Sequence, residues 1–172
     1  MVHQSNLYGE ACMDAVFSED KKYRYVLRRT WKTGRGMVAF IGLNPSTATE
    51  TSNDPTVSRC IDFAKRWGFS GMYMLNLFGL RSTNPTLLYE VRDPVGIDND
   101  RYIFETLGDV RLIVACWGNH GDLHNRSEEF YDLLRWKGFD LKCFKVTRKG
   151  EPIHPLYIKK NQQLQKYIRG GE

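Results

Sequence analysis

Short apolar segments alternate with segments of helical periodicity along this chain, and this order constrains the fold more than any other feature. Apolar, partly β-branched runs predict four buried strands, at about residues 37–43, 72–78, 111–117 and 141–146. Helices are expected between and after them, at about residues 55–67, 86–91, 98–107, 126–136 and 157–168. Strands separated by helices pair in parallel through right-handed crossovers. The sequence therefore predicts an α/β fold, a three-layer sandwich around a central, mostly parallel four-stranded sheet.

The beginning of the chain carries a different pattern. Over residues 12–31, side chains alternate around the polar turn E-D-K-K, with Tyr23, Tyr25 and Leu27 on one side. This alternation is typical of an antiparallel hairpin. No internal repeat or long linker divides the chain, so we expect one α/β domain over residues 1–172, with residues 1–36 as an N-terminal hairpin extension.

Polar residues stand where the predicted strands end. Asn44 lies in the turn G-L-N-P after the first strand, Asn76 lies near the end of the second, and the loop N-H-G-D follows the third. His154 lies beyond the fourth strand. Because successive parallel strands end at the same edge of a sheet, these side chains are expected to gather around one cleft. For Asn44 alone, a hydrogen bond within its own turn is the competing interpretation.

Composition excludes several classes of protein. The hydrophobic fraction is 41% and the charged fraction is 26%, which is ordinary for a soluble globular protein. No apolar run approaches the roughly 18 residues of a membrane span, and the first residues lack the pattern of a signal peptide. We therefore expect a cytoplasmic protein that does not contact a membrane.

The cysteines predict buried, reduced thiols. They are far apart and form no C-x-x-C pair: Cys12, Cys60, Cys116 and Cys143. A cluster assembled from these distant residues is the alternative left open. His120 and His124 flank Asp122, but a third metal ligand is not obvious, so we expect no metal and no cofactor.

The net charge of +5 is unevenly distributed. Residues 1–35 carry seven basic and four acidic groups, residues 36–141 carry ten and fourteen, and residues 142–172 carry eight and two, which gives +3, −4 and +6. The two basic ends could flank a polyanion if they meet in space. A solvated surface that only keeps the protein soluble explains the same charges.

Segments spread over the whole chain resemble family 1643 of the domains of unknown function, which are short bacterial and phage proteins. They are A-V-F-S, I-G-L-N-P-S-T-A, D-P-T-V-S-R, N-L-F-G-L-R-S-T-N-P, D-P-V-G-I-D-N-D, W-G-N-H-G and H-P-L-Y-I. More remotely, the layout is similar to the uracil-DNA glycosylase superfamily, an α/β fold whose members remove bases from DNA.

Three motifs carry the remote resemblance. I-G-L-N-P-S is similar to a turn whose Asn positions the attacking water, which implies that role for Asn44. M-L-N-L-F-G-L-R-S-T-N-P-T is similar to a strand and loop whose Asn reads the base edge, which implies Asn76 as the reader and Arg81 and Asn84 as phosphate or base contacts. H-P-L-Y-I resembles a late His-Pro-Ser motif whose His steadies the departing base, which implies His154.

The resulting functional hypothesis is a DNA glycosylase-like hydrolase that recognises a damaged or modified base, with DNA more expected than RNA as its partner. Asn44, Asp54 and His154 are the candidate catalytic residues. For Asp54, the role of general base competes with that of the helix N-cap before Pro55. For His154, a hydrogen bond to the base competes with one to loop carbonyls. The candidate substrate-binding residues are Gly42, Pro45, Ser46, Asn76, Arg81, Asn84, Asn119, His120 and Tyr157.

Two alternatives stay open. The protein is then either a nucleic-acid-binding module without catalysis, or an enzyme or binder of free nucleotides.

Overall fold

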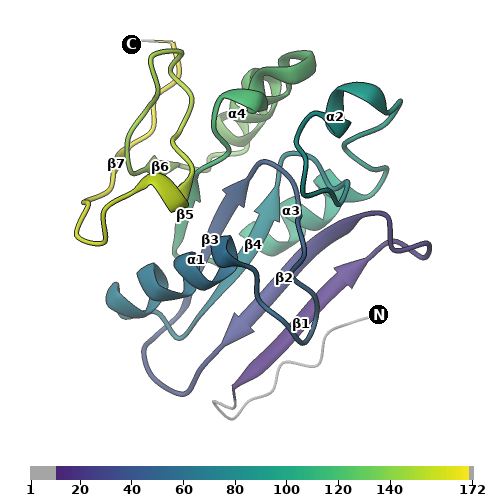
Figure 1. Cartoon of the computed structure of the whole chain (residues 1–172). Helices are drawn as coiled ribbons and strands as arrows, with labels where there is room; N and C mark the ends of the chain where they lie inside the picture. Colours follow the sequence, from purple (N-terminus) through teal and green to yellow (C-terminus); the bar gives the residue numbers. More distant parts are fainter. Residues whose placement is uncertain (1–10, 171–172) are drawn as a thin grey trace.

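The computed structural model describes residues 11–170. Over this range seven strands form one sheet in the order β1-β2-β4-β3-β5-β6-β7. Figure 1 shows the sheet between its helices. The strand bounds are β1 Cys12–Phe17, β2 Arg24–Thr30, β3 Met37–Gly42, β4 Gly71–Asn76, β5 Leu112–Ala115, β6 Lys142–Cys143 and β7 Gln165–Lys166.

The sheet as a whole is not mostly parallel, which corrects the prediction. Strands β4, β3, β5 and β6 occupy the four predicted positions and pair in parallel with their neighbours. The predicted hairpin is confirmed, but its strand β2 also pairs antiparallel with β4, and β7 pairs antiparallel with β6. The reason is that a parallel core leaves the backbone groups of its two outer strands unpaired, and each edge here receives an antiparallel neighbour.

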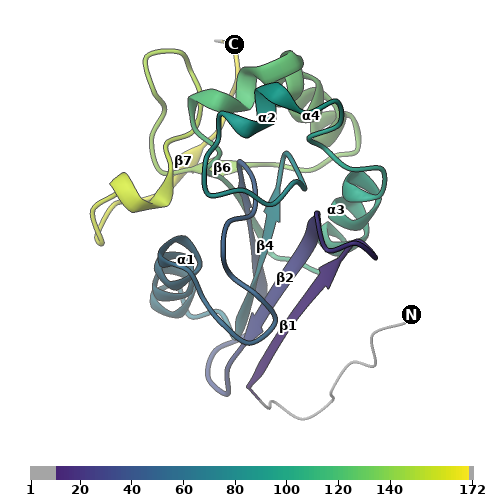
Figure 2. The same ribbon diagram turned by 45° about the vertical axis from the view of Figure 1, so that its right-hand side comes forward.

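Helices cover both faces of the sheet. They are α1 Pro55–Arg66, α2 Leu87–Glu90, α3 Asn99–Leu107 and α4 Arg126–Trp136, with 3₁₀ turns η1 Asn119–Asn125 and η2 Pro155–Tyr157. The alternating side chains of β3 account for this arrangement. Val38 and Phe40 pack in the cluster that contains the buried face of α1, whereas Ala39 and Ile41 pack in the cluster that contains α3 and α4. Figure 2 shows α1 on one side of the sheet and α3 on the other.

The helix predicted over residues 157–168 is wrong. The chain there makes the three-residue turn η2 and then the short strand β7. The buried side chains in this segment are Ile158 and Tyr167. They are nine positions apart and would lie on opposite faces of a helix, so a helix here could not bury both against the sheet. Instead the Tyr167 N–H donates to the carbonyl of Leu141 at 2.9 Å, which holds the segment against the sheet.

The strands of the two basic ends lie at opposite edges of the sheet. The hairpin β1–β2 forms one edge of the sheet and β6–β7 forms the other, with three strands between them. Across residues 11–170, no helix is both long and apolar enough to span a membrane.

Candidate functional site

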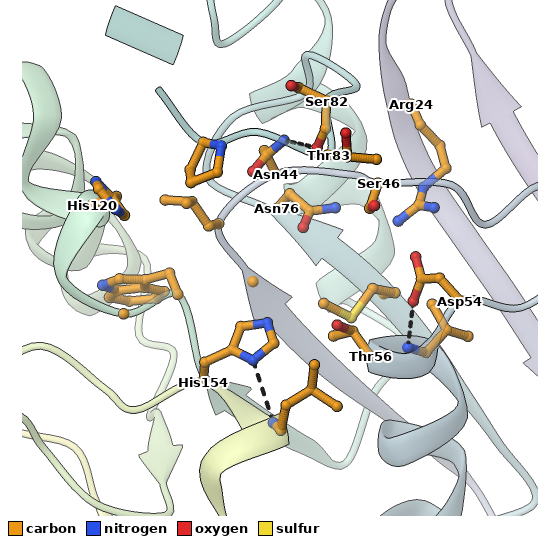
Figure 3. A pocket seen from close by; sticks show the side chains of 18 of the residues that line it. Arg24, Asn44, Ser46, Asp54, Thr56, Asn76, Ser82, Thr83, His120 and His154 are labelled. Carbon is orange, nitrogen blue, oxygen red and sulfur yellow. Dashed lines mark hydrogen bonds between the residues drawn. The ribbon is translucent and has the colours of Figure 1, made fainter. Parts of the chain in front are cut away.

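A cleft of about 540 Å³ lies at the carboxyl ends of β3, β4 and β5. Its volume falls in the range of about 300–1,000 Å³ that is usual for small-molecule sites. Parallel strands bring their ends together here, as the sequence predicted. The predicted site residues that line the cleft are Gly42, Asn44, Ser46, Asp54, Asn76, Asn119, His120, His154 and Tyr157. Figure 3 shows that Asn44, Asn76 and His154 come from different elements and surround one space.

Three predicted site residues do not line the cleft. Pro45 is buried under the loop, and its carbonyl accepts from the backbone N–H of Ser82 at 2.8 Å. Arg81 donates to the carbonyl of Lys21 at 3.0 Å and stacks on a hairpin phenyl ring. Asn84 accepts from the N–H of Thr86 at 3.1 Å within its own turn. These contacts hold the loop in place, so the roles implied for Arg81 and Asn84 do not follow from their positions.

Asn44 joins two loops through its carboxamide nitrogen. Nδ2 donates to the carbonyls of Pro45, Leu80 and Ser82 at 3.1, 3.3 and 3.0 Å. The competing interpretation, a hydrogen bond within its own turn, is therefore correct in part, but the side chain also spans to the loop after β4. Oδ1 has no hydrogen-bond partner among the described residues. This oxygen is an acceptor that a water or a ligand in the cleft can use.

Asn76 is the most unusual side chain of the cleft. It ends β4, lies opposite Gly42 in the β3–β4 register, and is 1% exposed. Neither its Nδ2 nor its Oδ1 has a hydrogen-bond partner. A methyl group on Gly42 would approach Oδ1 to 3.0 Å, so glycine leaves room for the carboxamide. Because a buried amide without partners is destabilising, its presence in a cleft is typical of a group kept for a ligand.

Asp54 is the N-cap of α1, which confirms one of its two interpretations. Its Oδ1 accepts from the N–H of Val57 at 2.8 Å, and its Oδ2 accepts from the N–H of Ala48 at 3.3 Å. The residue is 7% exposed. Both oxygens are thus engaged by backbone donors at the start of α1. The geometry therefore favours a structural role over general-base catalysis.

His154 presents a hydrogen-bond donor to the cleft. It is the N-cap of η2, and its Nδ1 accepts from the N–H of Leu156 at 3.3 Å. Burial lowers its pKa from the ordinary value of 6.5, and the smaller effect of Asp54 opposes this shift. A neutral ring whose Nδ1 accepts carries its proton on Nε2. Figure 3 shows this second nitrogen facing the space between the labelled side chains.

Aromatic side chains also line the cleft. Trp117 is buried, and its Nε1 donates to Glu151 Oε2 at 2.7 Å. His120 is exposed and shares a hydrogen bond of 3.0 Å between its Nδ1 and the hydroxyl of Tyr89. Tyr157, 84% exposed, lies at the mouth of the cleft. Planar rings beside polar amides suit a planar, polar ligand.

Asn119 also lines the cleft, where its Oδ1 accepts from the Thr147 hydroxyl at 2.7 Å.

Sequence reasoning missed several lining residues, of which Arg24 is the most informative. It begins β2 and is 2% exposed. A charged residue between Tyr23 and Tyr25 in an alternating apolar strand is the signal that could have identified it. The hydroxyl-bearing side chains that were missed are Thr56, Ser82 and Thr83.

Within the described chain, no group of three or more His, Cys, Asp or Glu side chains is placed to hold a metal ion. The four cysteines are free thiols, and the three predicted inside apolar segments, Cys60, Cys116 and Cys143, are buried. Burial raises the pKa of each of these three thiols. They are therefore poor nucleophiles and poor metal ligands in the folded protein.

Comparison with known proteins gives one match. The family model described as "Protein of unknown function (DUF1643)" matches residues 24–156. No curated protein and no solved structure matches the chain. The matched range contains Asn44, Asn76 and His154 and every other residue that lines the cleft except Tyr157.

Proposed function

Because the chain belongs to the DUF1643 family, whose description names no reaction, we propose a function from the cleft itself: the protein binds a nucleobase there and hydrolyses the N-glycosidic bond that joins it to a sugar in nucleic acid. DNA is the proposed partner, and a damaged or modified base is the proposed target. The remote resemblance to the uracil-DNA glycosylase superfamily is consistent with this proposal and supplies the reaction type.

The observation that carries the proposal is the unpartnered carboxamide of Asn76. An amide presents a donor and an acceptor side by side, which matches the edge of a nucleobase. Asn76 is buried at the end of β4 with both polar atoms free, and it lines the same cleft as the free Oδ1 of Asn44 and the ring of His154. Three groups with open hydrogen-bonding capacity thus line one cleft.

Each group has a definite role in the proposed reaction. Asn44 Oδ1 accepts a hydrogen bond from a water and orients its oxygen toward the sugar carbon; a carboxamide is not basic enough to remove the proton. As the water oxygen bonds to that carbon, the glycosidic C–N bond breaks and its electron pair passes to the base. One water proton stays on the new sugar hydroxyl, and the other is released to solvent, from which the base anion takes up a proton. His154 Nε2–H donates to the base as negative charge develops there. One preorganised donor of this kind contributes about 3 kcal/mol to a transition state.

A binding module without catalysis is the second candidate, and Asp54 favours it. Asp54 is the one carboxylate among the described residues that line the cleft, and both of its oxygens already accept backbone hydrogen bonds. Without a general base, bond breaking depends on stabilisation of the sugar cation and the departing base alone. Such a module binds nucleic acid with an affinity that falls as salt rises, and it releases no base.

One experiment separates these outcomes. The protein is incubated with single-stranded and duplex DNA that carry a panel of modified bases; released bases are measured by chromatography, and abasic sites by alkaline cleavage. The variants are Asn44→Ala and, as a matched control, Asn161→Ala, an exposed asparagine outside the cleft. We expect base release by the wild type and the control but not by Asn44→Ala.

Binding without release supports the module instead. If neither binding nor release is seen across the panel, both candidates are wrong.

A further inference from the structure

Arg24 is a buried cation with very few partners. Its side chain is 2% exposed and lines the cleft. Nη1 donates to the carbonyl of Ala48 at 3.0 Å, and Nε has no partner. Among the described residues, it makes no ion pair. Because burying a charged group is strongly unfavourable unless it is paired, this guanidinium is incompletely compensated.

A second arginine on the same strand shows what a compensated one looks like here. Arg29 is also 2% exposed. Its guanidinium donates to the side chain of Asn53 and to four backbone carbonyls, those of Asp14, Arg28, Thr49 and Ser52. Arg29 therefore clamps the loop before α1, whereas Arg24 has the same burial without that set of acceptors. The difference indicates that the acceptors of Arg24 come from outside the chain.

Further donors lie around Arg24 in the cleft. The hydroxyls of Ser46, Thr56 and Thr83 line it, and none of the three makes a hydrogen bond within residues 11–170. Thr56 also lies in the first turn of α1, a helix of 12 residues whose N-terminal end carries partial positive charge. Figure 3 shows Arg24, Ser46 and Asp54 at one side of the cleft.

Asp54 is the carboxylate whose charge favours the charged form of Arg24. It only partly offsets the effect of burial on the guanidinium. Burial lowers the pKa of Arg24 to about 10, and the charge of Asp54 opposes this shift without cancelling it. The guanidinium is therefore still a cation at neutral pH. The Asp54 oxygens are used by the N–H groups of Val57 and Ala48, as described above.

We propose that the Arg24 side of the cleft is an oxyanion subsite that binds a phosphate group of the nucleotide whose base occupies the rest of the cleft. With Nη1 bonded to Ala48, the Nε–Nη2 edge is left, and its two parallel N–H groups match two phosphate oxygens. The hydroxyls of Ser46 and Thr56 supply further donors. The identity of the ligand as a nucleotide rests on the proposed function, whereas the preference for an oxyanion rests on Arg24 itself.

Calorimetric titration tests the subsite without any reaction. The probes are inorganic phosphate, a set of deoxynucleosides and the matching deoxynucleoside 5′-monophosphates. A hydrogen bond to a charged group raises the affinity for a ligand by about tenfold or more. We therefore expect the wild type to bind at least one monophosphate about tenfold more tightly than its nucleoside. Arg24→Met should remove this difference and leave nucleoside binding unchanged.

Two further variants complete the series. Arg24→Lys keeps the charge but not the planar pair of donors, so it should keep only part of the preference. Arg148→Met, an exposed arginine outside the cleft, should keep all of it. Circular dichroism checks that each variant folds. If Arg24→Met does not fold, thermal unfolding of the wild type in phosphate, compared with chloride at equal ionic strength, tests the same site: a rise in the midpoint supports it, and no rise contradicts it.

The outcomes separate this inference from the proposed function. Equal affinity of the wild type for nucleoside and monophosphate overturns the subsite even where base release is detected. Binding of phosphate that depends on Arg24, without any binding of nucleosides or bases, supports the subsite and contradicts the nucleobase proposal. Titration with DNA strands identifies the source of the phosphate. If Arg24 binds a phosphate of the strand, Arg24→Met should lower the slope of log affinity against log salt concentration by about one.

Discussion

Replacing Asn76 with leucine should make the protein more stable and abolish its function. Leucine has the branching of asparagine but no polar atoms, and the two polar atoms that it replaces have no partner. An unpartnered buried amide is unfavourable by about 1–3 kcal/mol according to mutational data. We therefore expect Asn76→Leu to raise the free energy of unfolding by about 1–3 kcal/mol. With a urea m-value of about 1–3 kcal/mol/M, the unfolding midpoint rises by about 1 M.

The chain contains a matched control for this prediction. Asn99 is also fully buried and its Oδ1 also has no partner, but its Nδ2 donates to the carbonyls of Asn76 and Leu77 at 3.0 and 3.2 Å. Asn99→Leu removes the donor of these hydrogen bonds and should lower the free energy of unfolding by about 1–3 kcal/mol. The assay is urea unfolding followed by tryptophan fluorescence. Loss of stability in Asn76→Leu comparable to that in Asn99→Leu would refute the claim that Asn76 is kept for a ligand.

Three other predictions concern a buried carboxylate, the histidine of the cleft and the cysteines. Glu151 is 1% exposed and accepts hydrogen bonds from Trp117, Ser127 and Arg169. In urea titrations, Glu151→Gln should therefore lower the free energy of unfolding by about 3 kcal/mol, and a loss under about 1 kcal/mol would contradict this. Because burial lowers the pKa of His154, its neutral form is favoured by folding, and stability should fall as pH drops from 6.5 through the folded pKa. The His154→Gln variant should lack this pH-dependent part of the free energy of unfolding, which is measured from pH 7.5 to about 5. In the native protein a thiol reagent should label Cys12, and it should react with the three buried cysteines only after unfolding. Fast labelling of all four thiols in the native protein would contradict this prediction.

Local signals were sufficient to predict most helices. Asp54 and Pro55 mark the start of α1 in the sequence, and the structure confirms both the N-cap and the first helical position. The range 126–136 was also correct for α4, because Phe130 and Leu134 recur at helical spacing. These elements are determined by residues within a turn or two of each other, so a sequence read in order contains the information.

The candidate site was predicted in part for a similar reason. Asn44, Asn76 and His154 follow strands or a short turn, and parallel strands must end at the same edge of the sheet. Arg81 and Asn84 do not line the cleft, and their loop has no periodicity from which the direction of a side chain could be predicted. Arg24 was missed because the strand pattern suggests an exposed charge, whereas the loop before α1 covers it.

By itself, the sequence determined the alternation of strands and helices, the N-terminal hairpin and the polar ends of the central strands. Only the tertiary structure decided that the hairpin and β7 would complete the sheet edges, that Arg24 would be buried, and that Asn76 would lack hydrogen-bond partners. The physical reason is range. Periodicity and capping act between residues a few positions apart, whereas partners such as Asn99 and the Asn76 carbonyl are 23 positions apart and meet only when the chain has folded.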